Sequence, residues 1–594
     1  MKQFIKYVFA TMVGIFIIGV IISLSFIFGI VGMAATEGAA TSVEENSVLV
    51  IKLEGSIEER TEENPLAMLS GSKKLEETGL DNILTAIQHA KTEDNVKGIY
   101  IEAGSFEGAM PSTLQEIRNA LVDFKKDGKF IVSYGDNYSQ GEYYLSSVAD
   151  SIIINPQGLV EWSGLSSQVV YFKDLLEKVG VEMQVVKVGT YKSAVEPFLL
   201  NEISEANREQ ITTYSSEIWG EMTKAVSKSR GISAEKLNQL ADSAIVFSPT
   251  VTFKKEKLVD KLAYSDEVPQ IIANMMHLDD PDDYHTISVN DLAGIADSEP
   301  KGTSGNIIAV YYAVGDIVDQ PSDGFNTDPE IAGTKVIQDL KALADDDDVK
   351  AVVLRVNSGG GSAYASEQIW HQVMNIKAKK PIIVSMGDMA ASGGYYISCA
   401  ADYIYAEPTT LTGSIGIFGT FVNAGELLND KLGVHVSTVN TNQHSDIGNT
   451  TRPFTEQERN LFQRYINNGY ELFTKRCADG RKMKQDSIKA IAEGRVWTGL
   501  HAKQIGLVDE LGGIDKAIAM AKKRAKVSES TVICYPAKKE FFEDLMDNMS
   551  SDSYADAQMK QTLGEYYSIY SQLRSTTQRT GIQASMPYML RFNL

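Results

Sequence analysis

Ser392 stands in a setting that is typical of a catalytic nucleophile. Residues 381–400 read PIIVSMGDMAASGGYYISCA, in which an apolar, β-branched run precedes small residues around the serine and an aromatic segment follows. This order predicts a buried strand that turns directly into a helix. A serine at such a turn can attack a carbonyl, and the free N–H groups of a helix N-terminus can stabilise the resulting oxyanion. A serine that merely caps the helix is the alternative that this stretch leaves open.

A nucleophilic serine needs a base, and the chain offers three candidates. His371 falls in an amphipathic stretch, as a structural histidine would, whereas His444 lies close to Asp446 and could complete a Ser-His-Asp set. Lys192 follows an apolar run and has small and apolar neighbours. Burial there would lower the pKa of its ammonium group and leave a neutral amine as the base. The residue types alone leave this choice open.

The elements that would position these residues occur twice. The run IVSYGD at 131–136 reappears as IVSMGD at 383–388, and matching strand-like and helix-like runs surround both copies. Such self-similarity indicates homologous domains, and the alternation indicates parallel strands with crossover helices. We therefore predict an α/β fold with two tandem domains, over residues 46–265 and 306–530, joined by a polar linker at 266–305.

The two halves differ at the positions that could do chemistry. Gln140, which cannot act as a nucleophile, stands opposite Ser392, and GSFEG at 104–108 stands opposite NSGGG at 357–361. Conversely, Lys192 of the first half has a serine as its counterpart in the second. The second half therefore holds the nucleophile candidate, while the lysine candidate belongs to the first.

The two ends of the chain differ from its body. Residues 7–36 carry no charge and are dominated by Ile, Val, Phe, Gly and Met, which is long enough for a membrane-spanning helix. Lys2 and Lys6 precede this run and glutamates follow it, which favours the N-terminus inside and the body outside. Residues 1–45 are thus predicted to hold a cytoplasmic tip, a retained anchor and a short linker. Residues 531–594 are predicted to form a C-terminal extension.

The composition argues against several other classes of protein. With 56 basic and 78 acidic residues the net charge is −22, which argues against a nucleic-acid partner. Cys399, Cys477 and Cys534 lie far apart without metal-ligand spacing. We therefore predict neither a disulfide framework nor a metal site, and no cofactor.

Several motifs together resemble the signal peptide peptidase A (protease IV) family in its long, tandem-domain form. They are RVNSGGG at 355–361, MAASGGYY at 389–396, TGSIG at 412–416, YKSA at 191–194 and GRVWTG at 494–499. The resemblance covers nearly the whole chain. It implies a Clp-protease/crotonase-type fold and a bacterial serine peptidase with a Ser/Lys dyad.

The resemblance also implies a role for each residue of the site. It makes Ser392 the nucleophile and Lys192 the general base, with Ser414 as the serine that orients the lysine. The backbone N–H of Gly393 is one expected oxyanion donor.

The second oxyanion donor is expected in the glycine run. The chain has Gly359 where the family usually has proline, and glycine can take φ values closed to proline. Either Gly360 or Gly361 therefore remains the expected second donor.

The resemblance further implies substrates and surroundings. The expected substrates are cleaved signal peptides and other apolar peptides, cut endoproteolytically at the periplasmic face of the inner membrane. The expected assembly is a dome-shaped homotetramer whose apolar grooves face the lipid bilayer. Two rivals stay open: a non-catalytic membrane scaffold of the same fold, and a crotonase-type acyl-CoA enzyme with a similar oxyanion hole.

Overall fold

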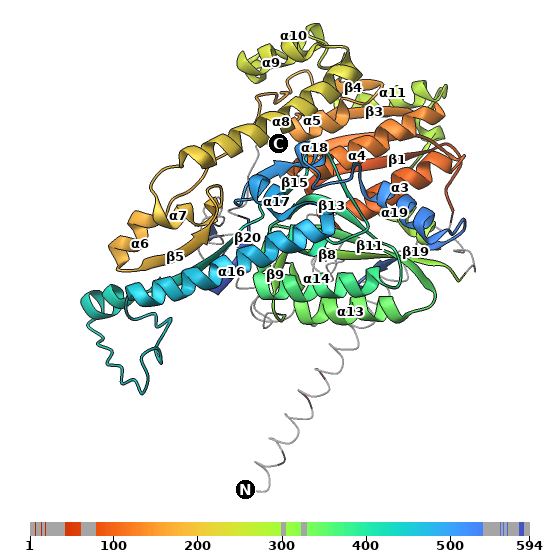
Figure 1. Ribbon diagram of the computed structural model, residues 1–594. Coiled ribbons are helices and arrows are strands. Elements are labelled where there is room, and N and C mark those ends of the chain that lie inside the picture. The colour runs from red at the N-terminus through yellow and green to blue at the C-terminus, as the bar shows by residue number, and fades with distance from the viewer. Residues whose placement is uncertain are drawn as a thin grey trace.

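The computed structural model describes residues 42–60, 79–298, 305–321, 329–537 and 581–586, together with the single positions 6, 14, 18, 559, 562, 563 and 567. Within these residues the chain forms three sheets with helices packed around them (Figure 1). Two of the sheets belong to the two repeats, and the third joins segments from both.

The first repeat is built on a six-stranded sheet in which all neighbouring strands run parallel. The neighbours Val48 and Leu49 of β1 are both fully buried although they point to opposite faces, because helices cover both sides of the sheet. In spatial order the strands are β6 (Lys261–Leu262), β4 (Ser151–Ile154), β3 (Phe130–Gly135), β2 (Val96–Gly108), β1 (Ser47–Ser56) and β7 (His285–Ser288). The accompanying helices are α3 (Leu80–Thr92), α4 (Pro111–Phe124), α5 (Gln140–Ser146), α8 (Glu205–Arg230), α9 (Ala234–Asp242), α10 (Thr250–Lys255), α11 (Val268–Met275) and α12 (Val289–Ser298).

The second repeat has an eight-stranded sheet that is parallel except for the pair between β15 and β17. Its central strands are buried on both faces, as the adjacent, fully buried Val352 and Val353 illustrate. The strands are β8 (Ile307–Val314), β11 (Val349–Ser358), β13 (Ile382–Ala391), β14 (Tyr403–Ala406), β15 (Leu411–Gly413), β17 (Val496–Thr498), β18 (Glu510–Leu511) and β19 (Thr531–Tyr535). The helices are α13 (Gly333–Asp345), α14 (Ala363–Lys377), α15 (Gly393–Ser398), α16 (Glu456–Arg481), α17 (Gln485–Ile491), α18 (Gly499–Gln504) and α19 (Ile514–Ala525).

The third sheet joins the two repeats. Its order is β10 (Glu330–Ala332), β9 (Asp316–Val318), β12 (Gly360–Ser362), β20 (Gly581–Ser585), β16 (Ile417–Asn423) and β5 (Glu182–Val188). Strand β5 belongs to the first repeat but pairs along its whole length, antiparallel, with β16 of the second. Together with α6 (Lys173–Val179) and α7 (Glu196–Leu199), β5 forms an arm that lies beside α16 (Figure 1).

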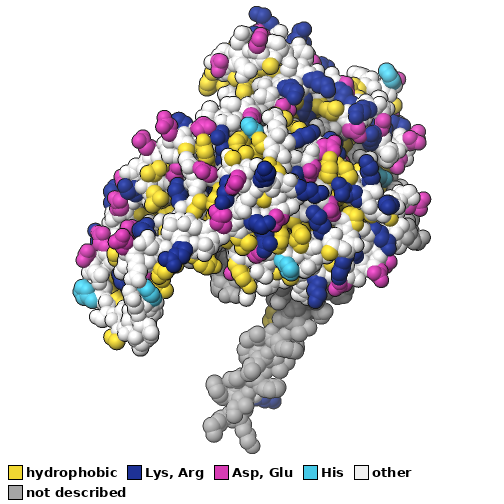
Figure 2. Space-filling view, in the orientation of Figure 1, with side chains coloured by type: hydrophobic (Ala, Val, Ile, Leu, Met, Phe, Trp, Pro, Cys, Tyr) yellow, Lys and Arg dark blue, Asp and Glu magenta, His cyan; other side chains and the backbone are white. Residues whose placement is uncertain are grey.

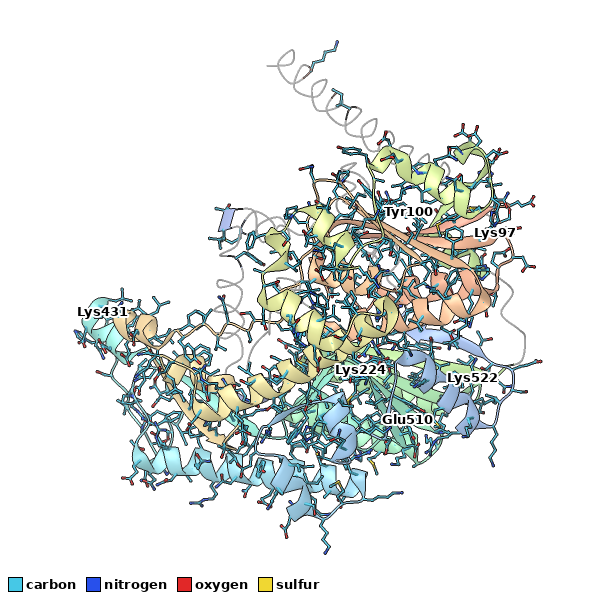
Figure 3. All side chains as sticks on the ribbon, turned by 90° about the horizontal axis from the view of Figure 1, so that it is seen from above. Lys97, Tyr100, Lys224, Lys431, Glu510 and Lys522 are labelled. Carbon is cyan, nitrogen blue, oxygen red and sulfur yellow. The ribbon has the colours of Figure 1, made fainter. Side chains whose placement is uncertain are left out.

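The view from above agrees with this arrangement (Figure 3). From above, Lys97 and Tyr100 on β2 mark the first sheet, Glu510 and Lys522 mark the second repeat, and Lys431 lies at the far end of the arm (Figure 3). Acidic and basic side chains are interspersed over the face drawn in Figure 2.

Most of the segment 266–305, which we expected to be a linker, belongs to the first repeat. Strand β7 extends the first sheet by pairing with β1, and α12 packs against α3. Ile287, Leu292 and Ile295 are buried in the core of this repeat. The acidic residues and prolines suggested a solvated connection, but the apolar residues between them are spaced so that one face is buried.

The two predicted terminal regions differ in how much of them is described. In the expected C-terminal extension, β19 joins the second sheet beside β8, and β20 enters the third sheet. The expected anchor at 7–36 lies outside the described residues except for Gly14 and Ile18. In the part of the chain that the structure describes, no helix combines the length and apolarity needed to cross a bilayer.

Candidate active site

Lys192 and Ser392 are in direct contact although they belong to different repeats. The lysine Nζ lies within hydrogen-bonding distance of Ser392 Oγ, at 2.8 Å, and both side chains are fully buried. Lys192 reaches this position because it follows β5, whose pairing brings Val188 opposite Ile417. The arm therefore delivers the lysine to the second repeat within a single chain.

Ser414 is the third member of this cluster. Lys192 Nζ donates to both the carbonyl oxygen and Oγ of Ser414, each over 3.0 Å. A neutral amine has two protons and one lone pair, so Nζ can donate to both Ser414 oxygens and accept a hydrogen bond from the Ser392 hydroxyl. Ser414 has a φ of 47°, and its N–H donates to the Arg495 carbonyl over 2.7 Å. The surrounding structure thus holds it in a backbone conformation that is uncommon for serine.

The environment of Lys192 favours its neutral form. Burial holds the pKa of its amine well below the ordinary lysine value. The Phe418 ring, whose centroid lies 5.9 Å from Nζ, would favour the cation, but this distance is at the limit of a cation–π contact. Desolvation therefore dominates, and it favours an uncharged amine with a lone pair that can accept a proton.

The backbone at Ser392 is strained in the way that is common at catalytic residues. The residue lies between β13 and α15 with a φ of 55° and a ψ of −110°, and its N–H donates to the Gly413 carbonyl over 2.8 Å. A non-glycine residue persists in such a region only when its surroundings enforce it. Its side chain makes no capping hydrogen bond to the helix, so the helix-cap alternative does not describe this serine.

Gly360 and Gly393, two of the predicted oxyanion donors, lie against each other in space. A Cβ on Gly360 would stand 2.6 Å from the Gly393 nitrogen, which leaves no space for a side chain. A Cβ on Gly361 would instead meet the backbone of Ile317 in β9, at 2.1 Å from its oxygen. The Gly360 N–H donates to Ser358 Oγ over 3.1 Å. Of the two candidates, Gly360 is the one that faces Gly393.

Gly359 does not use the conformational freedom that distinguishes glycine from proline. Its φ is not positive. A positive φ, which proline cannot adopt, is therefore not the reason why this chain has glycine at this position.

The histidine candidates lie elsewhere. His371 is exposed on α14, and His444 lies in the surface segment that precedes α16. Among the described residues, the Ser392 hydroxyl contacts Lys192 and, over 3.4 Å, the Gly416 carbonyl, but neither histidine. The structure does not assemble a Ser-His-Asp set.

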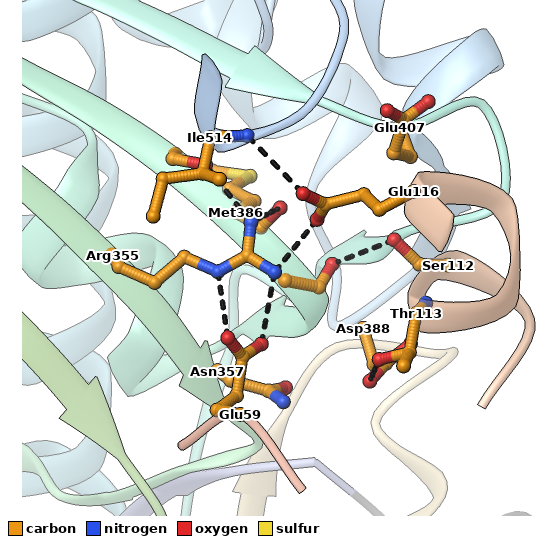
Figure 4. Close-up of polar contacts among 12 residues, drawn as sticks. Glu59, Ser112, Thr113, Glu116, Arg355, Asn357, Met386, Asp388, Glu407 and Ile514 are labelled. Carbon is orange, nitrogen blue, oxygen red and sulfur yellow. Dashed lines mark hydrogen bonds and ion pairs between the residues drawn. The ribbon is translucent and has the colours of Figure 1, made fainter. Parts of the chain in front are cut away.

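Arg355 forms a buried ion cluster beside the site. This cluster was not predicted from the sequence. Its guanidinium bonds both oxygens of Glu59, over 2.9 and 3.0 Å, and pairs with Glu116 over 2.6 Å (Figure 4). All three side chains are buried. Burial raises the pKa of both glutamates, and Arg355 opposes that rise. An arginine directly after the apolar run AVVL at 351–354 was the available signal, because a buried guanidinium requires acidic partners.

The same cluster connects the first repeat to the strands that carry the site. Asp388 of β13 accepts from the N–H and the hydroxyl of Thr113 over 2.8 and 2.5 Å (Figure 4). Burial raises its pKa to about 6. Because β11 leads to Gly360 and β13 leads to Ser392, these contacts hold both catalytic loops against the first repeat.

An apolar groove borders the site. It has a volume of about 860 Å³ and extends from β12 to α16. Its walls include Ile417, Phe421, Phe462 and Leu472, and Gly361 lies at its edge. Such a lining is suited to apolar side chains.

Comparisons with known proteins agree with the two repeats. The family model described as Peptidase family S49 matches residues 123–279 and 375–528, and the Clp protease model matches residues 326–410. Protease 4 of Salmonella typhi is 39% identical over 489 residues, or 81% of this chain and 78% of that protein. Protease 4 of Haemophilus influenzae is 34% identical over 537 residues, or 87% and 86%. Serine protease SPPA, chloroplastic, of Arabidopsis thaliana is 29% identical over 487 residues, or 82% and 70%.

Proposed function

The chain belongs to peptidase family S49 and is a serine peptidase with a Clp protease-like α/β fold, and we propose that Ser392 and Lys192 form its catalytic dyad. The 2.8 Å contact between Lys192 Nζ and Ser392 Oγ, in a fully desolvated site, is the observation that carries this proposal. Each repeat contributes one member of the dyad.

The proposed reaction begins with proton transfer from Ser392 Oγ to the neutral amine of Lys192. The serine oxygen attacks the peptide carbonyl to form a tetrahedral intermediate. The protonated lysine then donates its proton to the leaving amine as the C–N bond breaks. Water, deprotonated by the same lysine, hydrolyses the acyl-enzyme ester and restores the serine.

The oxyanion is proposed to be stabilised by the N–H groups of Gly393 and Gly360. Gly393 is the first residue of α15 and Gly360 the first residue of β12, and the Gly360 backbone lies against Gly393. In the resting site the Gly360 N–H is bonded to Ser358 Oγ, so it must exchange this partner for the oxyanion. Donors fixed by the fold stabilise the developing charge without reorganising solvent.

Replacing Ser414 by alanine should lower kcat/KM about three- to tenfold, because one hydrogen bond to Lys192 is typically worth about 1 kcal/mol. The carbonyl contact over 3.0 Å remains in this variant, so the loss should be partial. Kinetics on a fluorogenic peptide would measure it. A variant with unchanged kcat/KM would rule out an orienting role.

The pH dependence of kcat/KM should report the amine of Lys192. The base must be neutral, so activity should rise with pH through the folded-state pKa of the lysine. Because burial lowers that pKa well below the ordinary value, the midpoint should lie well under about 10.4. A pH–rate profile on a neutral peptide tests this expectation, and a midpoint at the ordinary lysine value would contradict it.

We further propose that the substrates are cleaved signal peptides and other apolar peptides. The apolar lining of the 860 Å³ groove supports this choice. The uncharged run at 7–36 supports anchoring in the inner membrane with the catalytic body in the periplasm. A homotetramer with grooves facing the bilayer completes this proposal.

Cleavage of matched peptides tests the proposed function. A synthetic signal peptide should be cut by the wild-type chain and not by Ser392→Ala, while a polar peptide of equal length should be cut slowly. If neither the wild type nor Ser392→Ala cuts the signal peptide, the non-catalytic scaffold is favoured. Activity on both peptides alike would argue against an apolar specificity.

A further inference from the structure

The segment 493–497 covers Lys192 from the side of the second repeat. It includes most of the motif GRVWTG, whose side chains take no part in the proposed reaction. A Cβ on Gly494 would stand 2.6 Å from the Lys192 Cβ and 2.7 Å from its nitrogen, so the two backbones touch. Beside this contact, the Tyr191 N–H donates to the Glu493 carbonyl over 3.0 Å. The segment 493–497 therefore contributes to the complete burial of Lys192.

The Arg495 side chain joins this segment to the loop that carries the lysine. Its guanidinium carbon lies 4.7 Å from the centroid of the Tyr191 ring and 4.5 Å from that of Trp497, so it contacts an aromatic ring of each repeat. The guanidinium also donates to the Tyr191 hydroxyl over 3.2 Å and to Glu209 Oε1 over 2.9 Å. The Tyr191 hydroxyl donates in turn to Glu209 Oε2 over 3.1 Å. Because Tyr191 directly precedes Lys192, these contacts also fix the lysine backbone.

The Trp497 ring continues the connection toward Ser392. A Cβ on Gly413 would stand 2.8 Å from Trp497 Cδ1, and the Gly413 carbonyl accepts the N–H of Ser392. Arg495 thus links the residue that precedes the proposed base with the ring that packs beside the backbone of the proposed nucleophile.

The ion pair between Arg495 and Glu209 is at the protein surface. Its side chains are 21% and 54% exposed, respectively, whereas Lys192 is fully buried. A pair this exposed contributes little to stability. Its position beside a dry site has a different consequence, because an opening of this junction would admit water to the amine.

Charged and titratable groups face the lysine loop from each element that packs against it. Lys187 of β5 donates to the Lys192 carbonyl over 3.4 Å, and the Glu493 carboxylate accepts from the Thr190 N–H over 3.4 Å. The other such groups are Tyr191, Glu196 of α7, Glu209 of α8, Arg495 and, behind Trp497, Glu217 with His501. Burial is the cause that lowers the pKa of Lys192, rather than any of these charges. Access of water to the amine therefore decides its protonation.

We propose that Arg495 is a positioning residue of the dyad, which holds the segment 493–497 over Lys192 and keeps water from its amine. The proposal rests on Lys192 as the base of the proposed function. With the segment in place, the amine stays dry and neutral beside Ser392. Without Arg495 the junction opens more readily, and water that reaches Nζ favours the ammonium form, which cannot accept the serine proton.

The pH dependence of Ser392 labelling by a fluorophosphonate probe tests this assignment, because labelling requires the base but no peptide binding. In Arg495→Met the midpoint of the labelling rate should rise by about one pH unit, part of the shift of up to about 3–5 units that full burial can produce. Below the wild-type midpoint the variant should label about tenfold more slowly, and this deficit should vanish above both midpoints. A deficit of the same size at every pH would show a merely structural role and overturn the assignment.

Two further variants accompany this measurement. Arg524→Met is the matched control, since Arg524 stacks on the Tyr403 ring at 5.5 Å on the exposed face of α19, and it should label like the wild type at every pH. An equal shift in this control would overturn the assignment. Tyr191→Phe removes only the hydroxyl that Arg495 and Glu209 share, so it tests the same junction if Arg495→Met does not fold. Its midpoint should also rise, and an unchanged midpoint in every folded variant of the junction would overturn the assignment.

These outcomes separate the inference from the function on which it rests. If Lys192→Met labels as fast as the wild type, the proposed dyad is wrong and the inference falls with it. If Lys192→Met does not label but Arg495→Met keeps the wild-type midpoint, the dyad stands and the role of Arg495 is overturned.

Discussion

Replacing Lys192 by methionine should lower kcat/KM by about 100- to 10,000-fold, the usual contribution of a general base. Methionine fills a similar volume and removes an amine whose burial is unfavourable for its charged form. The fold should therefore persist, with a Tm equal to or above that of the wild type. Kinetics on a fluorogenic apolar peptide and thermal unfolding provide the two measurements.

Lys192→Arg is the matched control for this substitution. Arginine places a basic side chain near Ser392, but its guanidinium does not lose its proton in proteins and so cannot accept another. It should be as inactive as the methionine variant. Near-normal turnover in either variant would show that another group takes the serine proton, and His444 would then have to be tested.

Replacing Arg355 by methionine should have the largest effect on stability. Glu59 and Glu116 would remain buried without their cation, and breaking a buried ion pair in this way costs about 3–5 kcal/mol. Urea unfolding followed by far-UV circular dichroism would measure the loss. Because β11 continues into the glycine loop, the folded fraction of this variant should also have a lower kcat.

The pH dependence of this loss identifies its cause. Without Arg355 the folded-state pKa of both glutamates should lie above the unfolded value of about 4.3, because burial is no longer opposed. A buried carboxyl group with a raised pKa is neutral at low pH and costs little there, but it must ionise as the pH rises. The loss in free energy of unfolding should therefore be small at low pH and grow as the pH rises. Adding Glu59→Gln and Glu116→Gln should recover stability at pH 8. A deficit that is the same at pH 5 and pH 8 would point to lost packing instead.

Much of the site could be predicted from the residues alone. A serine among small residues after an apolar strand indicated a nucleophile turn, and the internal repeat showed that the lysine belongs to the other half. The family resemblance of these motifs is confirmed by the matches over both repeats. Local signals were sufficient here because the chemistry constrains residue types within a few positions of Ser392.

Other features depend on contacts between distant segments. The linker interpretation of 266–305 overlooked β7 and α12, whose apolar residues are buried only against β1 and α3. The pairing of Arg355 with Glu59 and Glu116 joins residues hundreds of positions apart. No periodicity or motif in a single sequence identifies such partners. The sequence around a glutamate does not indicate whether its side chain faces solvent or a buried arginine.

By itself the sequence determined the α/β repeats, the nucleophile turn and the candidate lysine, since periodicity, small residues and duplication are properties of neighbouring positions. Only the tertiary structure decided that Lys192 meets Ser392 within one chain, because that contact depends on the pairing of β5 with β16. It also decided that β20 pairs between β12 and β16, since main-chain pairing is nearly indifferent to side chains and leaves little trace in the sequence.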